Sequence, residues 1–256
     1  MTASGASITG ADRYSETFRV THSSDLLRRL WAEAMRDQYP SEVEPFSSCS
    51  WWLLGRLVAE LRLRPGAMLV DLGCGRGGPG LWLARALSAN LTSVDYSATA
   101  IELAASRAPA FLESGRATFR VGTFDATGLP DGLANGVVSV DALPFSPDRD
   151  ASLREVRRIL APGGRVAFTG NQHLDRSSDS WEQQLARAGL RFEHGVRDPH
   201  SRDHWRSLYA LWTANADGLR EELGDVVAEQ LLNEAAAVDS VATRVACLFV
   251  ASRPAD

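Results

Sequence analysis

The sequence contains no lysine, and all 27 of its basic residues are arginine. Chemistries that need a titratable amine, such as Schiff-base catalysis or a phosphate-binding lysine loop, are therefore excluded. Cysteine is also scarce, because Cys49, Cys74 and Cys247 are odd in number and have no Cys-x-x-Cys spacing. This pattern supports neither a disulfide framework nor a zinc cluster, and it predicts a reducing compartment, the cytoplasm.

No apolar run approaches the ~18 residues that can span a membrane, and the first ten residues lack the basic and apolar regions of a signal peptide. Positive charge is in deficit as well, with a formal net charge of −5 over 256 residues. A basic surface that would collect phosphates is therefore not expected. We expect a folded enzyme with a small-molecule substrate, and neither nucleic acid nor a membrane as partner.

Apolar residues recur at helical spacing between residues 24 and 63, with a break at 40–45. After Pro65 and Gly66, apolar runs alternate with helical stretches, which predicts an α/β, doubly wound, mostly parallel seven-stranded sheet. We expect an N-terminal tail and helical cap over 1–64 and a core over 65–256, with a helical lid insertion at about 197–240. The expected strands are 67–70, 91–94, 117–121, 136–140, 165–169, 190–194 and 245–251, the last pairing antiparallel at an edge.

A glycine-rich turn follows the first expected strand. Gly73, Gly75 and Gly78 satisfy G-x-G-x-x-G, and Asp95 lies 20 positions after Gly75, which alone suggests a dinucleotide site. Asp71 stands directly before the turn, where its carboxylate would repel a pyrophosphate and attract a positive charge. The ligand is therefore expected to be nucleoside-like and positively charged.

This turn resembles the first motif of the class I S-adenosylmethionine-dependent methyltransferases, acid-x-Gly-x-Gly-x-Gly. Four further segments follow in that family's order, at 95–97, 125–126, 140–141 and 160–165. The resemblance covers residues 65–169 and implies the Rossmann-like methyltransferase fold. It also implies S-adenosyl-L-methionine as cofactor, with S-adenosyl-L-homocysteine as product.

The resemblance implies a role for each motif residue. The glycines of the turn would admit the methionine part, Asp95 would accept hydrogen bonds from the ribose hydroxyls, and Asp125 would accept one from the adenine amino group. Tyr96 would lie against the adenine ring. Cys74 has no positioned base in the motif and is expected to be inert. The residues implied at the cofactor are Asp71, Gly73, Cys74, Gly75, Asp95, Tyr96, Asp125, Ala126 and Val140.

Methyl transfer to oxygen or carbon also needs a base, and four residues are candidates. His173 follows the fifth expected strand in the loop that borders the acceptor pocket in this family, although a solvated loop histidine explains it equally well. Asp141 ends the fourth strand and either contacts the acceptor or caps a loop. His200 and His204 share one face of an expected helix and could reach the pocket from a lid. No metal is expected, because Ser201 stands where a zinc-protease motif has glutamate.

The flanking segments carry aromatic residues that we expect around the two substrates. Tyr39 and the segment 46–48 would close over the donor. A lid rich in aromatic side chains would accept an aromatic or polycyclic acceptor. Six aromatic residues outside the motif core supply flat apolar surface either for core packing or for this acceptor, namely Trp51, Trp52, Trp181, Trp205, Tyr209 and Trp212.

The acceptor class follows from two further features. The segment 141–145 departs from the Asn/Asp-Pro-Pro-aromatic tetrapeptide of enzymes that methylate nucleic-acid bases, which again favours a small molecule. Exclusive use of arginine is typical of high-GC bacterial genes, so we expect a natural-product scaffold of secondary metabolism, such as antibiotic biosynthesis. An NAD-dependent oxidoreductase, a methyltransferase-like cyclase that keeps its cofactor without methyl transfer, a non-catalytic binding protein and a homodimer stay open.

Overall fold

The computed structural model describes residues 10–173, 179–237 and 244–255. The helices are α1 Gly10–Ser23, α2 Asp25–Met35, α3 Trp51–Leu61, α4 Gly78–Ala86, α5 Ala98–Arg107, α6 Arg149–Ile159, α7 Trp181–Arg187, α8 Ser201–Ala214 and α9 Ala216–Ala236. The strands are β1 Met68–Leu72, β2 Asn90–Asp95, β3 Ala117–Val121, β4 Ala134–Ser139, β5 Leu160–His173, β6 Arg191–Arg197 and β7 Arg244–Ser252. Short 3-10 turns lie at Arg36–Gln38, Ala108–Ala110 and Leu143–Phe145.

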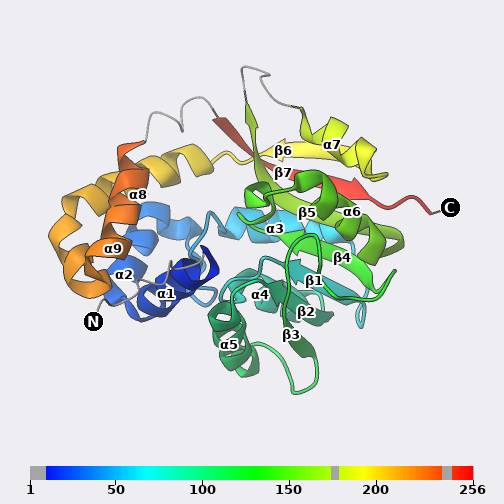
Figure 1. Ribbon diagram of the computed structural model, residues 1–256, viewed down its shortest axis with the longest axis horizontal. Coiled ribbons are helices and arrows are strands. Elements are labelled where there is room, and N and C mark those ends of the chain that lie inside the picture. The colour runs from blue at the N-terminus through cyan, green and yellow to red at the C-terminus, as the bar shows by residue number, and fades with distance from the viewer. Residues whose placement is uncertain (1–9, 174–178, 238–243, 256) are drawn as a thin grey trace, which may run out of the picture.

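The strands form one seven-stranded sheet in the order β3-β2-β1-β4-β5-β7-β6, shown in Figure 1. Strands β1 to β5 pair in parallel, and β7 runs antiparallel to β5 and β6. The doubly wound, mostly parallel sheet is therefore confirmed. The expected position of the last strand was wrong, because β7 lies between β5 and β6, and β6 is the edge strand. Strand order depends on long-range pairing, which hydrophobic periodicity does not reveal.

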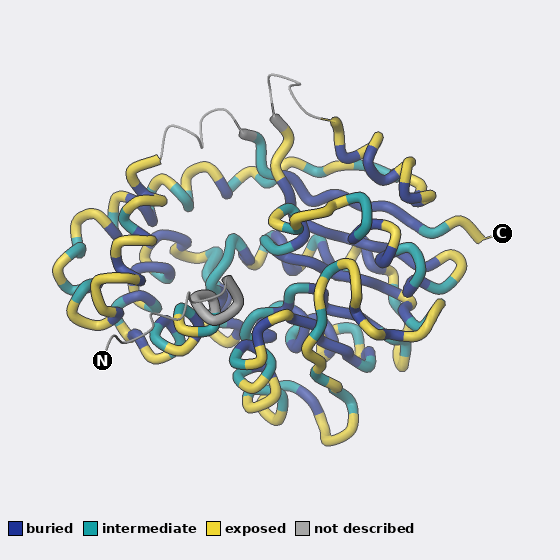
Figure 2. The backbone as a smooth tube through the Cα atoms, in the orientation of Figure 1, coloured by how far each residue is buried: buried dark blue, intermediate teal, exposed yellow. Residues whose placement is uncertain are grey.

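Helices cover both faces of the sheet, and successive strand residues point to opposite faces. Leu69 faces the core under α3 and α4, and its neighbour Val70 faces the core under α6 and α7. Figure 2 shows the central strands buried and the outer helix faces exposed. The first core contains Leu54, Leu57, Leu81, Leu91 and Ala167, and the second contains Leu153, Ile159, Val166, Phe168 and Leu185. Burial on both faces explains the nearly continuous apolar runs of the strands.

The N-terminal helices and the late insertion share a third hydrophobic core. Helix α2 packs on α8 and α9, beside the tips of the strands (Figure 1). Trp31 is the centre of this core, with edge contacts to Trp205 and Trp212. Tyr209 and Trp212 are buried here, whereas Trp181 packs on Phe168 in the sheet. These aromatic side chains therefore stabilise the fold, and none of them is among the described residues that line the central cleft defined below.

Several local signals lead to the observed boundaries. Ser24, Ser50 and Ser97 cap α2, α3 and α5 by accepting a hydrogen bond from the backbone N–H three residues later. The helix at 98–107 and the strand at 117–121 match their predicted bounds. Helix α1 was not predicted, because the sequence before residue 24 has only a weak apolar pattern. Strand β5 is longer than predicted, because its second half pairs with β7.

Candidate functional site

A cleft opens where β1 and β4 lie side by side in the centre of the sheet. The chain leaves β1 for β2 and β3 on one side and returns to β4 on the other, so β1 and β4 form the topological switch point. Ligands of open α/β sheets bind beyond the strand ends at this point. The cleft, which we call the central cleft, has a volume of ≈ 580 Å³ counted to its mouth. It is lined by the turn after β1, residues 140–142 after β4, and residues 43–47. Its place at the switch point makes the central cleft the candidate ligand site.

The glycine turn is held by hydrogen bonds to the end of β2. The backbone N–H groups of Gly73 and Cys74 donate to the carbonyl oxygen of Val94 at 2.8 and 3.1 Å. Gly73 and Gly75 have φ angles of 74° and 51°, a region that disfavours residues with a Cβ. A Cβ at Gly73 would lie 2.4 Å from the Cβ of Ala142. The turn therefore requires glycine for its conformation and for the close approach of the loop after β4.

Asp71, in β1, lies beneath this turn and beside the first turn of α4. Its carboxylate accepts a hydrogen bond from the N–H of Gly80, and a Cβ at Gly80 would lie 2.3 Å from the Oδ2 atom. Asp71 is 2% exposed, and within the described ranges its Oδ2 atom has no hydrogen-bond partner. Burial, together with the charge of Asp95, raises the pKa of Asp71 to about 7. A cationic group in the cleft would satisfy this oxygen.

Asp95 ends β2 and faces the glycine turn. Its Oδ2 accepts from the N–H of Gly75 at 2.9 Å, and its Oδ1 accepts from the N–H of Ser97 at 3.0 Å. Burial raises the pKa of Asp95, and these backbone donors oppose that effect. Ser97 also contacts Ser15 of α1 through its hydroxyl at 2.9 Å. Tyr96, between them, is 38% exposed. These backbone donors thus hold the carboxylate beside the glycine turn; its predicted role toward ribose hydroxyls stays a prediction.

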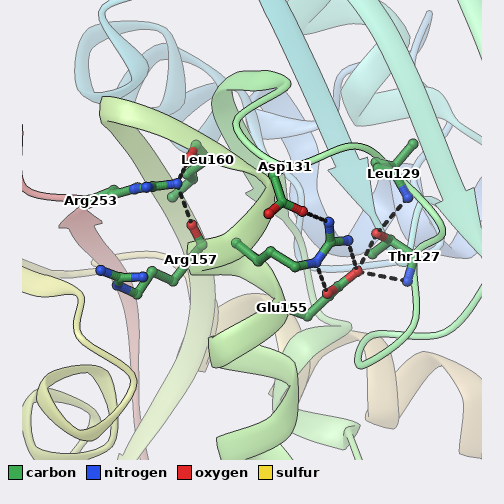
Figure 3. A network of polar contacts seen from close by, with 8 residues as sticks. Thr127, Leu129, Asp131, Glu155, Arg157, Leu160 and Arg253 are labelled. Atoms are coloured by element: carbon green, nitrogen blue, oxygen red, sulfur yellow. Dashed lines mark hydrogen bonds and ion pairs between the residues drawn. The ribbon is translucent and has the colours of Figure 1, made fainter.

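Asp125 lies in the loop between β3 and β4, and a buried polar network fixes that loop (Figure 3). Asp125 and Ala126 are themselves exposed, and Asp125 accepts from the hydroxyl of Thr123 at 2.7 Å. Two residues on, the N–H of Thr127 donates to Glu155 of α6 at 3.0 Å. Arg158 donates to both oxygens of Glu155 at 2.7 Å and also reaches Asp131 (Figure 3). Helix α6 therefore positions the loop that carries Asp125.

Glu155→Gln is expected to lower the free energy of unfolding by about 1–3 kcal/mol at pH 7. The amide would bring an N–H group against Thr127 or Arg158. Burial alone would raise the pKa of Glu155, but the hydrogen bonds from Arg158 and Thr127 outweigh it and hold the pKa below its ordinary value. The contribution of Glu155 is therefore present above the ordinary carboxyl range and is lost as pH falls through the folded-state pKa.

Urea unfolding of the wild type and Glu155→Gln at pH 7 and at acidic pH measures both effects. The difference in stability should shrink as the pH falls. Glu102→Gln on the exposed surface of α5 is the matched control and should unfold like the wild type. Equal stability of Glu155→Gln and Glu102→Gln at pH 7 would show that the network does not stabilise the loop.

Val140 and Asp141 follow β4 and line the central cleft. Asp141 has a φ of 50°, and its carboxylate accepts from the N–H of Ser48 at 2.6 Å and from the hydroxyl of Thr169 at 2.8 Å. Both oxygens are therefore engaged in joining the segment before α3 to the ends of β4 and β5. This arrangement favours a loop-capping role for Asp141 over proton removal from an acceptor.

The structure describes the side chains of His200 and His204 but not that of His173, and it places neither of the first two at the central cleft. His173 is the last residue of β5, where it pairs with Arg244, but its side chain lies outside the part that the structure describes. His200 and His204 stack at the start of α8, with ring centroids 5.6 Å apart. The carboxylate of Asp198 accepts from the N–H of His200 at 2.8 Å. Neither His200 nor His204 is among the described residues lining the central cleft, so the structure does not bring them to the cofactor motifs.

Other sequence expectations concern metals, membranes and Cys74. In the described residues no group of three or more His, Cys, Asp or Glu side chains is placed to hold a metal ion. No helix within the described ranges is long and apolar enough to cross a bilayer. The thiol of Cys74 lies in the cleft wall, and burial raises its pKa, which agrees with an inert residue.

Several residues of the cleft were not anticipated from the sequence as site residues, among them one aromatic and three charged side chains. Phe18 of α1 lies over the glycine turn, where a Cβ at Gly75 would come within 3.2 Å of its ring. Glu44, Arg76 and Arg107 also line the cleft, beside Phe46 and Ser47, whose position agrees with the expected closing segment. The motif contained Arg76, but nothing in its spacing indicated that the side chain borders the cleft. Tertiary packing of α1 and the 39–48 segment brings these residues together.

The family comparison agrees with this geometry. Residues 70–168 match a family model described as a methyltransferase domain. The chain contains a methyltransferase domain. The methyltransferase GfsG of Streptomyces halstedii is 30% identical over 151 residues, which cover 57% of this chain and 54% of that protein. The 27-O-demethylrifamycin SV methyltransferase of Amycolatopsis mediterranei is 32% identical over 146 residues, with the same two coverages of 57% and 54%. The chain thus spans about half the length of these curated relatives.

Solved structures share the methyltransferase fold over nearly the whole chain. The cyclase SpnF has a TM-score of 0.72 at 20% identity, over 94% of this chain and 97% of its own. The phosphoethanolamine N-methyltransferase 2 of Haemonchus contortus, solved with S-adenosyl-L-methionine, has a TM-score of 0.70 at 16% identity, over 94% of this chain and 60% of its own. At such identities the likeness shows the fold alone, which is the Rossmann-like methyltransferase fold that the motifs predicted.

Proposed function

We propose that this methyltransferase domain transfers a methyl group from S-adenosyl-L-methionine to a small molecule, a natural-product scaffold of secondary metabolism. The observation that carries the proposal is the buried Oδ2 of Asp71, which has no partner in the described residues and lies beneath a glycine turn that Asp95 holds through the N–H of Gly75. A carboxylate at that place suits the ammonium end of an amino acid, and a carboxylate at the end of β2 suits ribose hydroxyls. The rifamycin relative supports the acceptor class.

The residues present fit this cofactor. Asp71 would accept from its ammonium group, the turn at Gly73 and Gly75 would admit its methionine chain, and Asp95 would accept from its ribose. Asp125 and Tyr96 lie on the loops beyond β3 and β2, where they would border the adenine. When bound, S-adenosyl-L-methionine supplies an electrophilic methyl group on a positively charged sulfur. The chain's own contribution would be to orient donor and acceptor and to exclude water. Phe18 and the 43–47 segment line the cleft and are placed to help exclude water.

The cysteines and the net charge bear on the cellular compartment and on the acceptor. The three cysteines are free and buried, which supports a reducing compartment such as the cytoplasm. The net charge of −5 supports a small acceptor over nucleic acid. Among the candidate bases, His173 stays a prediction.

Calorimetry with S-adenosyl-L-homocysteine and with oxidised NAD tests the cofactor. The carboxylate of Asp71 accepts from Gly80 in the first turn of α4, where a dinucleotide would place its pyrophosphate. We therefore expect S-adenosyl-L-homocysteine to bind and NAD not to bind. Binding of NAD without binding of S-adenosyl-L-homocysteine would overturn the proposal. The cyclase alternative is separated by mass spectrometry, since only a methyltransferase yields products heavier by one methyl group than the small molecules supplied.

Asp95→Ala is expected to weaken binding of S-adenosyl-L-homocysteine by about 1–3 kcal/mol, roughly 5- to 150-fold. The change removes the predicted acceptor for the ribose and also frees the N–H groups of Gly75 and Ser97. Asp95→Asn keeps one oxygen acceptor and should lose less. Calorimetric titration of the three proteins measures the series, and unchanged affinity in Asp95→Ala would remove Asp95 from the donor site.

A further inference from the structure

A second, smaller cavity opens beside the central cleft, between the end of α1, α2 and the segment before α3. It shares Glu44, Phe46 and Arg76 with the central cleft, and His22 and Trp31 are among its other lining residues. We call it the side cavity. None of the cofactor motifs reaches it except through Arg76, so the proposed donor roles above leave its polar groups unexplained.

Arg76 places a half-buried positive charge between the two cavities, without an ion-pair partner in the described residues. Its guanidinium donates to the carbonyl oxygens of Thr21 at 3.5 Å and Glu44 at 3.2 Å, and no ion pair involves it in the described part of the chain. Arg107 lies beside it and likewise donates to carbonyl oxygens, including that of Val43 at 2.8 Å. Burial and the charge of Arg107 lower the pKa of Arg76 to about 10, so the group is still charged at neutral pH. The other partner of Arg76 in the described residues is the ring of Phe46, whose centroid lies 5.9 Å from the guanidinium carbon. A partly buried cation whose partners are carbonyl oxygens and an aromatic ring is unfavourable until an anion joins it.

Two further residues that line the side cavity each carry a polar atom without a partner in the described residues. The indole N–H of Trp31, a residue 4% exposed, and the Nδ1 atom of His22 have no hydrogen-bond partner among the described residues. Buried polar atoms in native proteins are nearly always paired, so these atoms point to a ligand or to ordered water. The one acidic side chain lining the cavity in the described residues, Glu44, already pairs with Arg28 at 3.3 Å. The charge facing the cavity is therefore positive.

We propose that the side cavity is an anion subsite, in which Arg76 and the N–H of Trp31 bind a carboxylate of a molecule held in the central cleft, with His22 beside them. A planar carboxylate suits the guanidinium fork and would supply the missing counter-charge. Two sources share this chemistry, namely the amino-acid carboxylate of the donor and an acid group on the acceptor. The first source rests on the proposed function, and the second does not.

Calorimetry with ligands that differ only in the carboxylate tests the donor source. The wild type should bind S-adenosyl-L-homocysteine about 10- to 150-fold more tightly than its decarboxylated analogue. Arg76→Gln should remove this preference by weakening S-adenosyl-L-homocysteine alone, and Arg76→Lys should keep part of it. Arg154→Gln, which removes a charge from the exposed surface of α6, is the matched control and should keep the full preference. Melting temperatures check that each variant folds. If Arg76→Gln does not fold, the carboxylate preference of Arg76→Lys relative to the wild type tests the proposal instead.

Benzoate, titrated into the protein with and without S-adenosyl-L-homocysteine, tests the acceptor source. Benzoate binding that Arg76→Gln abolishes, with the donor preference unchanged, assigns the subsite to an acidic acceptor. If Arg76→Gln alters neither the carboxylate preference nor benzoate binding, the subsite does not exist. If the wild type binds no S-adenosyl-L-homocysteine, the proposed function fails, and the benzoate titration still decides whether the anion subsite is present.

Discussion

Replacing Asp71 with asparagine is expected to weaken binding of S-adenosyl-L-homocysteine by about 2–3 kcal/mol, roughly 30- to 150-fold. The Oδ2 atom of Asp71 is buried and has no partner in the described residues, and its position in the cleft wall suits the ligand's ammonium group. Asparagine keeps the shape of the side chain and the acceptor for the N–H of Gly80, but it removes the charge. Calorimetry measures the loss.

The affinity for S-adenosyl-L-homocysteine should also depend on pH through Asp71. The pKa of Asp71 is about 7, and a cationic ligand binds its ionised form, so wild-type affinity should rise about tenfold from pH 6 to pH 8. Asp71→Asn should lose this dependence. Because burial raises the folded-state pKa of Asp71 above its unfolded value, its contribution to stability falls as pH rises between those two values.

Asp71→Asn should therefore melt no lower than the wild type at pH 8, while binding the ligand more weakly. Asp225→Asn, an exposed position on α9, is the matched control and should change neither property. An Asp71→Asn protein with wild-type affinity and an unchanged pH profile would show that this carboxylate does not contact the ligand.

Gly73→Ala is expected to lower the free energy of unfolding by about 3 kcal/mol or more and to abolish measurable donor binding. The residue has a φ of +74°, which costs an alanine roughly 1–2 kcal/mol by itself. Its new Cβ would also lie 2.4 Å from the Cβ of Ala142 and 3.1 Å from the ring of Phe124. The loops after β3 and β4 would have to move, and both border the predicted cofactor site. Urea unfolding and calorimetry measure the two effects.

Gly163→Ala separates the cost of the positive φ angle from the cost of the close contact with Ala142. Gly163 has nearly the same φ of +75°, but nothing lies within 4 Å of an added Cβ. This control should show the cost of the backbone conformation alone and should bind S-adenosyl-L-homocysteine normally. If Gly73→Ala is no less stable than Gly163→Ala, the close approach of the glycine turn and Ala142 is not a constraint on the site.

The residues predicted from the motifs differ in how far the structure supports their placement. Asp71, Gly73, Cys74, Gly75 and Val140 line one cleft, and the carboxylate of Asp95 accepts a hydrogen bond from the N–H of Gly75 in the turn. Motif spacing could predict this grouping, because parallel strands end at one edge of the sheet. The catalytic candidates were predicted from their place in loops alone. Loop position does not reveal what a side chain contacts, and the structure shows Asp141 engaged by Ser48 and Thr169.

By itself, the sequence determined the alternation of strands and helices, the glycine turn and the acidic residues that follow the strands. These features depend on backbone conformation and hydrophobic period, which are local properties. Only the tertiary structure decided that β7 lies inside the sheet, that α2 packs on α8 and α9, and that α1 brings Phe18 over the turn. Each of these depends on contacts between residues distant in sequence, whose free energy comes from burial of shared apolar surface. The anion subsite at Arg76 belongs to this second class, since α1, α2 and the glycine turn build it together.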